Sequence, residues 1–522
     1  MRRTRLGGEG RQGAAKPVVG VRRSFLATAA PGRGGLVKHL PAIVAVIAGA
    51  ALLGSLPGCG DGGSGGGTNF PAGSTSWVHH WNEIAINASG LDHTPPAPGE
   101  TRVYKQQFGP TRASRAIAIV HIAIYDAVNA IVGGAQSYTN LPRAPEGTSM
   151  KAAIAQSAHD TLVALFSAQT TSFDEQLATD LAAIEDGQAK SDGIALGQQA
   201  AAAILAMRAN DGSDHPEPVV GVDYIPGDGP GIWRPDPISK GTIALGALWS
   251  EVRPFSMTSA EQFRVPQPPA LESPEYAAAY NDVKSIGGDG VVTPTVRTED
   301  QTETGIFWAY DGTPNLCAPP RLYNQMIATI ADLEGSNVVQ LARLLALANV
   351  AMADAGIAIW ESKFYYKYWR PVTGIREADA GTGPTGQGDN NPETEGDPNF
   401  TPLGAPLSNG SGPNFTPPFP SYPSGHAGFG GALFGVLRRF YGRDDVPFTF
   451  VSDELNGITL DNKGQVRPRL PRSFSTFTQA EEENGQSRIY LGIHWKFDKD
   501  QGIAQGEQIA DWVMQNTFVP AR

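Results

Sequence analysis

Residues 337–362 constrain the fold of this 522-residue chain more than any other segment. They read NVVQLARLLALANVAMADAGIAIWES and are apolar almost all round. A helix with apolar side chains on every face has to be surrounded by other elements. We therefore expect a long central helix, buried among further helices.

Several other segments have helical periodicity. In residues 113–131, Ile117, Val120, Ile124 and Val128 follow one another at three- and four-residue steps and would form one apolar stripe. Helices are also expected at 150–167, 174–186, 191–209, 424–441, about 480–494 and 502–516. Because sustained alternation of period two is scarce, we predict an all-α fold of helical bundles.

The helices should be joined by long loops, because the chain contains 62 Gly and 41 Pro. Turn-forming pairs are concentrated in residues 210–240 and 379–423. Loops of this length are more often functional than idle. The second loop leads directly into a group of chemically active residues.

Residues 1–59 are predicted to be an export signal. The segment contains RRSFL, which resembles a twin-arginine motif, then an uncharged apolar run, and it ends in LPGC at Cys59. LPGC resembles a lipobox, so we expect a lipid anchor at Cys59 and a periplasmic or cell-surface location. An uncleaved membrane anchor is the alternative. Residues 60–72 are a Gly-rich linker.

Charge and cysteine content exclude several kinds of function. The first 40 residues hold nine Lys or Arg and one Glu, whereas the whole chain has a formal charge of −12, so the remainder is strongly acidic. An acidic body argues against nucleic-acid binding. Cys59 and Cys317 are the two cysteines. They are too few for a cysteine-based zinc site, and a lipidated Cys59 would leave Cys317 without a disulfide partner.

The last third of the chain carries three clusters of chemically active residues. In the first, Lys363 and Arg370 are seven residues apart and Pro371 follows. On a continuing helix the two cations would share one face, and Pro371 would mark the exit from that helix.

The second cluster, Pro423-Ser424-Gly425-His426, precedes a helical pattern. Free backbone N–H groups at a helix N-terminus attract anions, and glycine allows an anion to approach the backbone closely.

The third cluster contains Ser487, Arg488, His494 and Asp498. Asp498 follows His494 by four residues and could orient its ring if the segment is helical.

Each cluster has an ordinary explanation on its own. Paired cations on a helix face usually form a solvated surface, Ser-Gly-His at a helix start is usually a cap, and a histidine with a nearby aspartate is often structural. Together the clusters supply one lysine, two arginines and two histidines. If they converge, they would build a site for a tetrahedral oxyanion.

The order K-x6-R-P, P-S-G-H and S-R-x5-H-x3-D resembles the signature of the acid phosphatase and vanadium-dependent haloperoxidase (PAP2) superfamily. The flanking segments RAIAIVHIAIYDAVNAI and PPFPSYPSGHAGFGGA resemble the haloperoxidase branch. The resemblance implies a vanadate cofactor, with hydrogen peroxide and halide as substrates and an organic acceptor as a further partner. Halide would be oxidised to hypohalous acid.

The resemblance also implies a role for each matched residue. His494 would bind vanadium and His426 would be the acid–base group. The other positions would hold the oxyanion or orient its ligand: Lys363, Arg370, Ser424, Gly425, Arg488 and Asp498. Trp360 and Phe419 match the aromatic positions of chloroperoxidase-like members and would form the halide pocket. Core packing is the alternative explanation for these two aromatic residues.

Two other functions remain open. An acid phosphatase could use the same residues, with His494 attacking phosphorus and His426 protonating the leaving group. A non-catalytic oxyanion-binding lipoprotein is the third hypothesis. Whichever holds, we expect residues 73–335 to form an N-terminal helical region and 336–522 the catalytic region. Asp354 is a carboxylate in an apolar helix, so we expect it to bond an arginine or histidine of the site.

Overall fold

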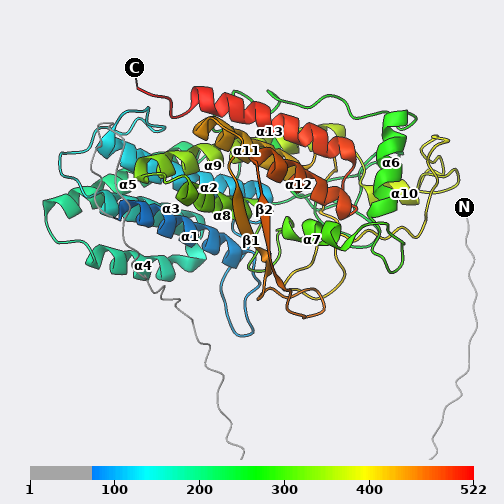
Figure 1. Cartoon of the computed structure of the whole chain (residues 1–522), viewed down its shortest axis with the longest axis horizontal. Helices are drawn as coiled ribbons and strands as arrows, with labels where there is room; N and C mark the ends of the chain where they lie inside the picture. Colours follow the sequence, from blue (N-terminus) through cyan, green and yellow to red (C-terminus); the bar gives the residue numbers. More distant parts are fainter. Residues whose placement is uncertain (1–72, 522) are drawn as a thin grey trace, which may run out of the picture. The chain divides into compact units, whose positions relative to one another are not determined.

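The computed structural model describes residues 73–521, which are predominantly helical (Figure 1). The helices are α1 (Ser74–Asp92), α2 (Gly109–Val132), α3 (Met150–Leu165), α4 (Thr170–Ala182), α5 (Gln188–Arg208), α6 (Pro274–Ile286), α7 (Glu299–Phe307), α8 (Pro319–Leu333), α9 (Val338–Tyr366), α10 (Pro371–Arg376), α11 (Gly425–Tyr441), α12 (Phe477–Tyr490) and α13 (Lys496–Asn516). A small antiparallel sheet is formed by β1 (Phe448–Asn456) and β2 (Arg469–Phe474). The predicted all-α class is confirmed, with this hairpin as an addition. The export signal, Cys59 and the linker lie outside the described residues.

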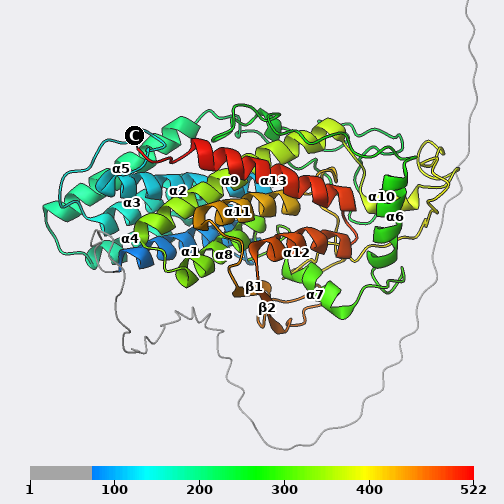
Figure 2. The same cartoon turned by 45° about the horizontal axis from the view of Figure 1, so that its top comes forward.

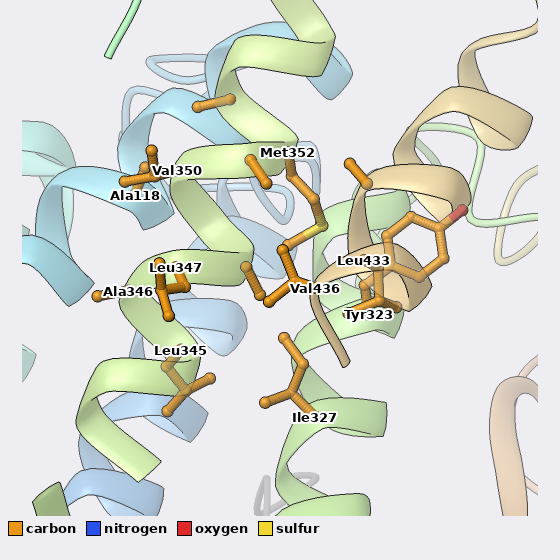
Figure 3. Packing of buried hydrophobic residues seen from close by; sticks show 14 of the residues in the cluster. Ala118, Tyr323, Ile327, Leu345, Ala346, Leu347, Val350, Met352, Leu433 and Val436 are labelled. Carbon is orange, nitrogen blue, oxygen red and sulfur yellow. The ribbon is translucent and has the colours of Figure 1, made fainter. Parts of the chain in front are cut away.

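Helix α9 lies at the centre of the core, as its all-round apolar sequence predicts. It packs against α2, α11 and α13 (Figure 2). Leu345, Leu347 and Val350 are fully buried in this cluster (Figure 3). The helix begins with a capping box in which Asn337 and Gln340 satisfy each other's backbone N–H groups. Helices α2 and α9 are long and apolar enough to cross a membrane, but 83% and 94% of their apolar windows are buried within the protein.

Helices α11 and α13 approach each other closely because glycines line their contact. A Cβ atom on Gly506 would lie 2.2 Å from the carbonyl oxygen of Gly428, and one on Gly431 would lie 2.5 Å from that of Ile503. Side chains at these positions would force the helices apart. The close contact holds the N-terminal end of α11, which carries His426, beside the start of α13, which follows His494.

Two predicted helix boundaries in the C-terminal half differ from those of the structure. The helix expected at about 480–494 ends at Tyr490, and the one expected at 502–516 begins at Lys496. His494 therefore lies in a short connector between them.

The predicted loop at 379–423 contains no helix or paired strand of the sheet. The predicted division between residues 335 and 336 stays a prediction, and α2 and α9 pack directly across it.

Candidate oxyanion-binding active site

The three sequence clusters converge on one buried place. Lys363 comes from the last turn of α9, and Arg370 caps the start of α10. Ser424 caps α11, and Arg488 belongs to the last turn of α12. A cavity of about 330 Å³ opens onto this place, and its lining includes Gly425, His426, Arg488 and His494. The convergence that the sequence left open is therefore present.

Lys363 and Arg370 belong to two different helices, which the sequence did not predict. Helix α9 ends at Tyr366, Lys367 adopts a left-handed conformation with φ 53°, and Pro371 starts α10. The expected continuous helix, with Pro371 at its exit, is therefore wrong. The turn at Lys367 redirects the chain so that Arg370 enters the site from a second helix.

The Lys363 ammonium is buried and lies among backbone carbonyls of the 379–423 loop. Its Nζ donates to the carbonyl oxygens of Pro420 and Ser421, both at 2.8 Å, and of Pro423 at 2.5 Å. Burial lowers the pKa of Lys363 well below its usual value, and the neighbouring Arg370 lowers it further. A bound anion would offset both effects and favour the charged ammonium.

The two arginines retain buried N–H groups without partners. Arg370 donates from Nε to the Phe419 carbonyl at 3.0 Å, while its Nη2 makes no hydrogen bond to any described residue. Arg488 donates from Nη2 to both carboxylate oxygens of Asp311, at 2.7 and 2.9 Å. Its Nε and Nη1 have no partner among the described residues. Buried donors without acceptors are costly, so this arrangement favours an anion between the arginines.

Asp311 is a site residue that sequence reasoning missed. Its side chain is 4% exposed and it lines the cavity. Burial raises the pKa of its carboxyl group, whereas Arg488 opposes this shift. Asp311 lies after α7, far from the three motifs, and no periodicity marks it. Its contact holds the Arg488 guanidinium in a fixed orientation.

His426 lies on the first turn of α11, and its ring faces both backbone and cavity. Its Nε2 lies 2.6 Å from the carbonyl oxygen of Ala309. A carbonyl can only accept, so Nε2 carries the proton and Nδ1 has the free lone pair in the neutral ring. Burial lowers the pKa of His426 well below its usual value, and Arg488 lowers it further.

Ser424 and Gly425 form the start of α11 beside this histidine. The Ser424 hydroxyl accepts weakly from the Ala427 N–H at 3.5 Å. A Cβ atom on Gly425 would lie 3.3 Å from the Trp360 ring, so a side chain there would press on the cavity wall. The helix N-terminus thus offers polar donors without bulk.

His494 is held between a carboxylate and a guanidinium. Its Nδ1 lies 2.7 Å from Oδ2 of Asp498, and its Nε2 lies 2.9 Å from Nη1 of Arg370. A guanidinium has no acceptor, so Nε2 accepts and carries a lone pair, while Nδ1–H donates to Asp498. Burial lowers the pKa of His494 well below its usual value, and the charges of Arg370 and Lys363 lower it further. The ring is therefore neutral and presents Nε2 toward the arginine.

Asp498 does not reach His494 along one continuous helix. It occupies the third position of α13, and its Oδ2 also accepts the Trp495 N–H at 3.1 Å. The expected contact therefore forms across the start of α13. Burial raises the pKa of Asp498 to about 7, although Lys363 opposes the shift.

Trp360 and Phe419 contact each other in the wall of the cavity. Their ring centroids are 4.9 Å apart in an edge-on arrangement, and Trp360 Nε1 donates to the Leu245 carbonyl at 2.9 Å. Phe419 also lies 5.1 Å from the Lys363 ammonium and 5.0 Å from the Arg370 guanidinium. The two rings pack in the core and also line the cavity, and their role as a halide pocket stays a prediction.

The expectation for Asp354 is wrong. Its carboxylate accepts three backbone N–H groups, from Phe255 at 2.6 Å and from Ser256 and Met257 at 2.8 Å. The buried carboxylate does have partners, as expected, but they are amides of the 252–260 loop and not an arginine or histidine of the site. Asp354 therefore anchors a loop against α9.

The donor set fits a tetrahedral oxyanion such as vanadate. Lys363, Arg370 and Arg488 supply three cationic side chains, and the two arginines supply unpaired N–H groups. His494 adds a nitrogen lone pair that could bind a metal centre. Among the described residues no cluster of three or more His, Cys, Asp or Glu side chains could hold a metal cation.

The chain is similar to several known proteins. Residues 343–519 match the model of the VCPO second helical-bundle domain. The chain is similar to the vanadium chloroperoxidase of Curvularia inaequalis, with 38% identity over 279 residues. That match covers 46% of this chain and 44% of the relative, so it spans less than half of either protein.

Solved structures show the same fold. A bacterial vanadium-dependent iodoperoxidase matches with a TM-score of 0.66 and 22% identity, over 87% of this chain and 100% of the other. The holo form of a bacterial vanadium-dependent chloroperoxidase matches with a TM-score of 0.58 and 18% identity, over 78% and 92%. The chain therefore has the helical fold of the vanadium haloperoxidases.

Proposed function

We propose that this protein, whose residues 343–519 match the model of the VCPO second helical-bundle domain, is a vanadate-dependent haloperoxidase that oxidises halide with hydrogen peroxide. One observation carries the proposal. Two buried arginines, Arg370 and Arg488, have N–H groups without partners among the described residues. Lys363 and the Nε2 lone pair of His494 lie in the same site. This combination suits an oxyanion that also accepts a nitrogen ligand.

Lys363, Arg370 and Arg488 would hold the charged oxygens, with Ser424 and the Gly425 N–H as further donors. His494 would bind through Nε2 after Arg370 releases it. Each charge-assisted hydrogen bond contributes roughly 1.5–3 kcal/mol. Three such contacts, together with the bond to His494, are sufficient for micromolar retention, which corresponds to about 8 kcal/mol. When bound, vanadate supplies a Lewis-acid centre that polarises peroxide for attack by halide.

His426 would handle the protons of peroxide at Nδ1. Its Nε2 is committed to the Ala309 carbonyl, so proton exchange is left to the opposite ring nitrogen. A neutral ring at ordinary pH can accept a proton there. Asp498 would keep the proton of His494 on Nδ1 and leave Nε2 free to bind.

The aromatic wall would receive the halide. Trp360 and Phe419 exclude water beside the buried cations, and a weakly hydrated pocket favours oxidation of chloride as well as bromide. The named relatives include a chloroperoxidase and an iodoperoxidase. We accordingly propose chloride and bromide as substrates, to be ranked by turnover.

The phosphatase alternative uses the same donors, but the relatives named above are peroxidases and do not favour it.

Export through residues 1–59, with lipidation at Cys59, is a further proposal. It is tested by mass analysis of the N-terminus of the protein recovered from its native membrane fraction. An unmodified start before residue 59 would contradict lipidation.

The function is tested by two assays on one preparation. The full-length protein is freed of oxyanions, and halogenation of a β-diketone by peroxide with chloride or bromide is measured before and after orthovanadate is added. Hydrolysis of an aryl phosphate is measured in parallel. We expect halogenation after vanadate addition and loss of it in His494→Ala. Phosphoester hydrolysis that vanadate inhibits, without halogenation, would assign the site to a phosphatase.

A further inference from the structure

The active-site cavity has a polar inner part and a much larger apolar part. His426, Arg488 and His494 mark the polar part. The rest of the lining is dominated by apolar side chains from several loops and helices, among them Phe108, Ile243, Leu245, Phe415, Phe419 and Phe429. Peroxide and halide have no need of so extensive an apolar wall.

The cavity is also larger than those two substrates require. Its volume is about 330 Å³. A water-sized molecule occupies about 30 Å³ of liquid, so peroxide, a halide and a water together fill only part of it. Cavities of about 300–1,000 Å³ with mainly apolar and aromatic walls are typical binding sites for small organic molecules.

An exposed cation without an acidic partner among the described residues lines this cavity. Lys105 lines the cavity and is exposed, and its Nζ lies 4.8 Å from the ring centroid of Phe108. No ion pair joins Lys105 to any described carboxylate. The one carboxylate in the lining, Asp311, is already bonded to Arg488. With an oxyanion in the inner part, Lys105 would be the uncompensated charge facing an incoming molecule.

From this arrangement we propose that the cavity binds an aromatic acceptor that carries a carboxylate, with its ring against the apolar wall and its carboxylate toward Lys105. This substrate class rests on the proposed haloperoxidase function. Hypohalous acid formed in the inner part would transfer halogen to a ring carbon. The oxygen–halogen bond breaks, a carbon–halogen bond forms, and the displaced hydroxide takes the ring proton as water.

Binding is measured first, because it does not depend on turnover. The vanadate-loaded full-length protein is titrated calorimetrically with 4-hydroxybenzoate and with its methyl ester, without peroxide or halide. We expect saturable binding of the acid. Lys105→Glu should weaken binding of the acid about three- to tenfold and leave binding of the ester nearly unchanged. Ile243→Ala should weaken the binding of both ligands. Lys463→Gln, which replaces an exposed lysine outside this cavity, should leave the binding of both ligands unchanged.

Kinetics then link binding to the reaction. The halogenation rate of the acid should saturate with acceptor concentration, with a KM that rises in Lys105→Glu while bromide-dependent peroxide consumption without acceptor stays unchanged. No saturable binding of the acid, or equal effects of Lys105→Glu on acid and ester, would overturn the proposal. Binding without any halide-dependent peroxide consumption would instead contradict the haloperoxidase function and leave the ligand site intact.

Discussion

Nη1 of Arg370 donates to Nε2 of His494 across 2.9 Å, and this contact fixes the tautomer of the histidine. Because a guanidinium can only donate, the lone pair of His494 must lie on Nε2 and its proton on Nδ1. Arg370 therefore fixes the orientation of His494 Nε2, the nitrogen that would bind vanadate. The same arginine would also hold the oxygens of the vanadate. Arg370 can exchange one acceptor for another when the oxyanion arrives.

The carboxylate behind His494 should control vanadate affinity. Asp498 accepts the Nδ1 proton at 2.7 Å and makes Nε2 a better electron donor. We predict that Asp498→Asn weakens vanadate binding about 10- to 100-fold, measured by equilibrium dialysis. Asp500→Asn, which alters a partly exposed aspartate on the same helix, serves as the control. Equal affinities for Asp498→Asn and the unmodified protein would exclude this role.

Arg488 should not be replaceable by lysine. Lysine would keep the charge but lose the planar donors that are now unpaired, Nε and Nη1. At about 1.5–3 kcal/mol for a charge-assisted bond, Arg488→Lys should weaken vanadate binding roughly 10- to 100-fold. Arg443→Lys, at an exposed ion pair with Glu334, should have no effect. A normal dissociation constant for Arg488→Lys would mean that charge alone holds the anion.

His426 should act in turnover more than in binding. Its Nδ1 is the free ring nitrogen, and its loss removes the proton-transfer group while the three cations remain. We predict that His426→Ala lowers kcat about 10²- to 10⁴-fold and changes vanadate affinity only a few-fold. Steady-state kinetics at saturating vanadate separate the two quantities. A loss of affinity as large as the loss of kcat would assign His426 to binding.

Asp354 should make stability depend on pH. Burial raises its pKa to about 6 from an ordinary 3.8, so the folded protein holds this proton more tightly than the unfolded chain does. Its contribution is therefore fully present below about pH 4 and is lost as the pH rises to about 6. The loss amounts to roughly 3 kcal/mol.

The variant Asp354→Asn tests this dependence, because it cannot titrate. Its Tm should be lower at acid pH than that of the unmodified protein, and it should change less between pH 4 and pH 7. Asp445→Asn, at an exposed position, is the control and should keep the original profile. An unchanged pH profile in Asp354→Asn would show that other groups set the dependence.

Most of the site is predictable from the sequence because its residues occur in three compact motifs. Lys363, Ser424 and His494 are identified because the three motifs together resemble a known signature, and the buried central helix follows from its all-round apolar pattern. The path between motifs is not predictable in this way. Lys367 takes a left-handed turn without being glycine, so nothing in the sequence marks the end of α9.

Contacts to backbone are the second kind of feature that the sequence does not supply. A buried carboxylate at Asp354 demands a partner, but amides of any residue can serve, so the loop it holds carries no signal. The same holds for Ala309, whose carbonyl fixes His426. Asp311 is an isolated aspartate in the sequence, and only the fold brings it to Arg488.

The most direct test of the haloperoxidase function is a titration of the oxyanion-free, full-length protein with orthovanadate, followed by bromide-dependent consumption of hydrogen peroxide. We predict that the rate rises from none to a plateau at one vanadate per chain. We also predict that His494→Ala stays inactive throughout. A rate that is present before vanadate is added, or one that never appears although vanadate is bound, would contradict this function.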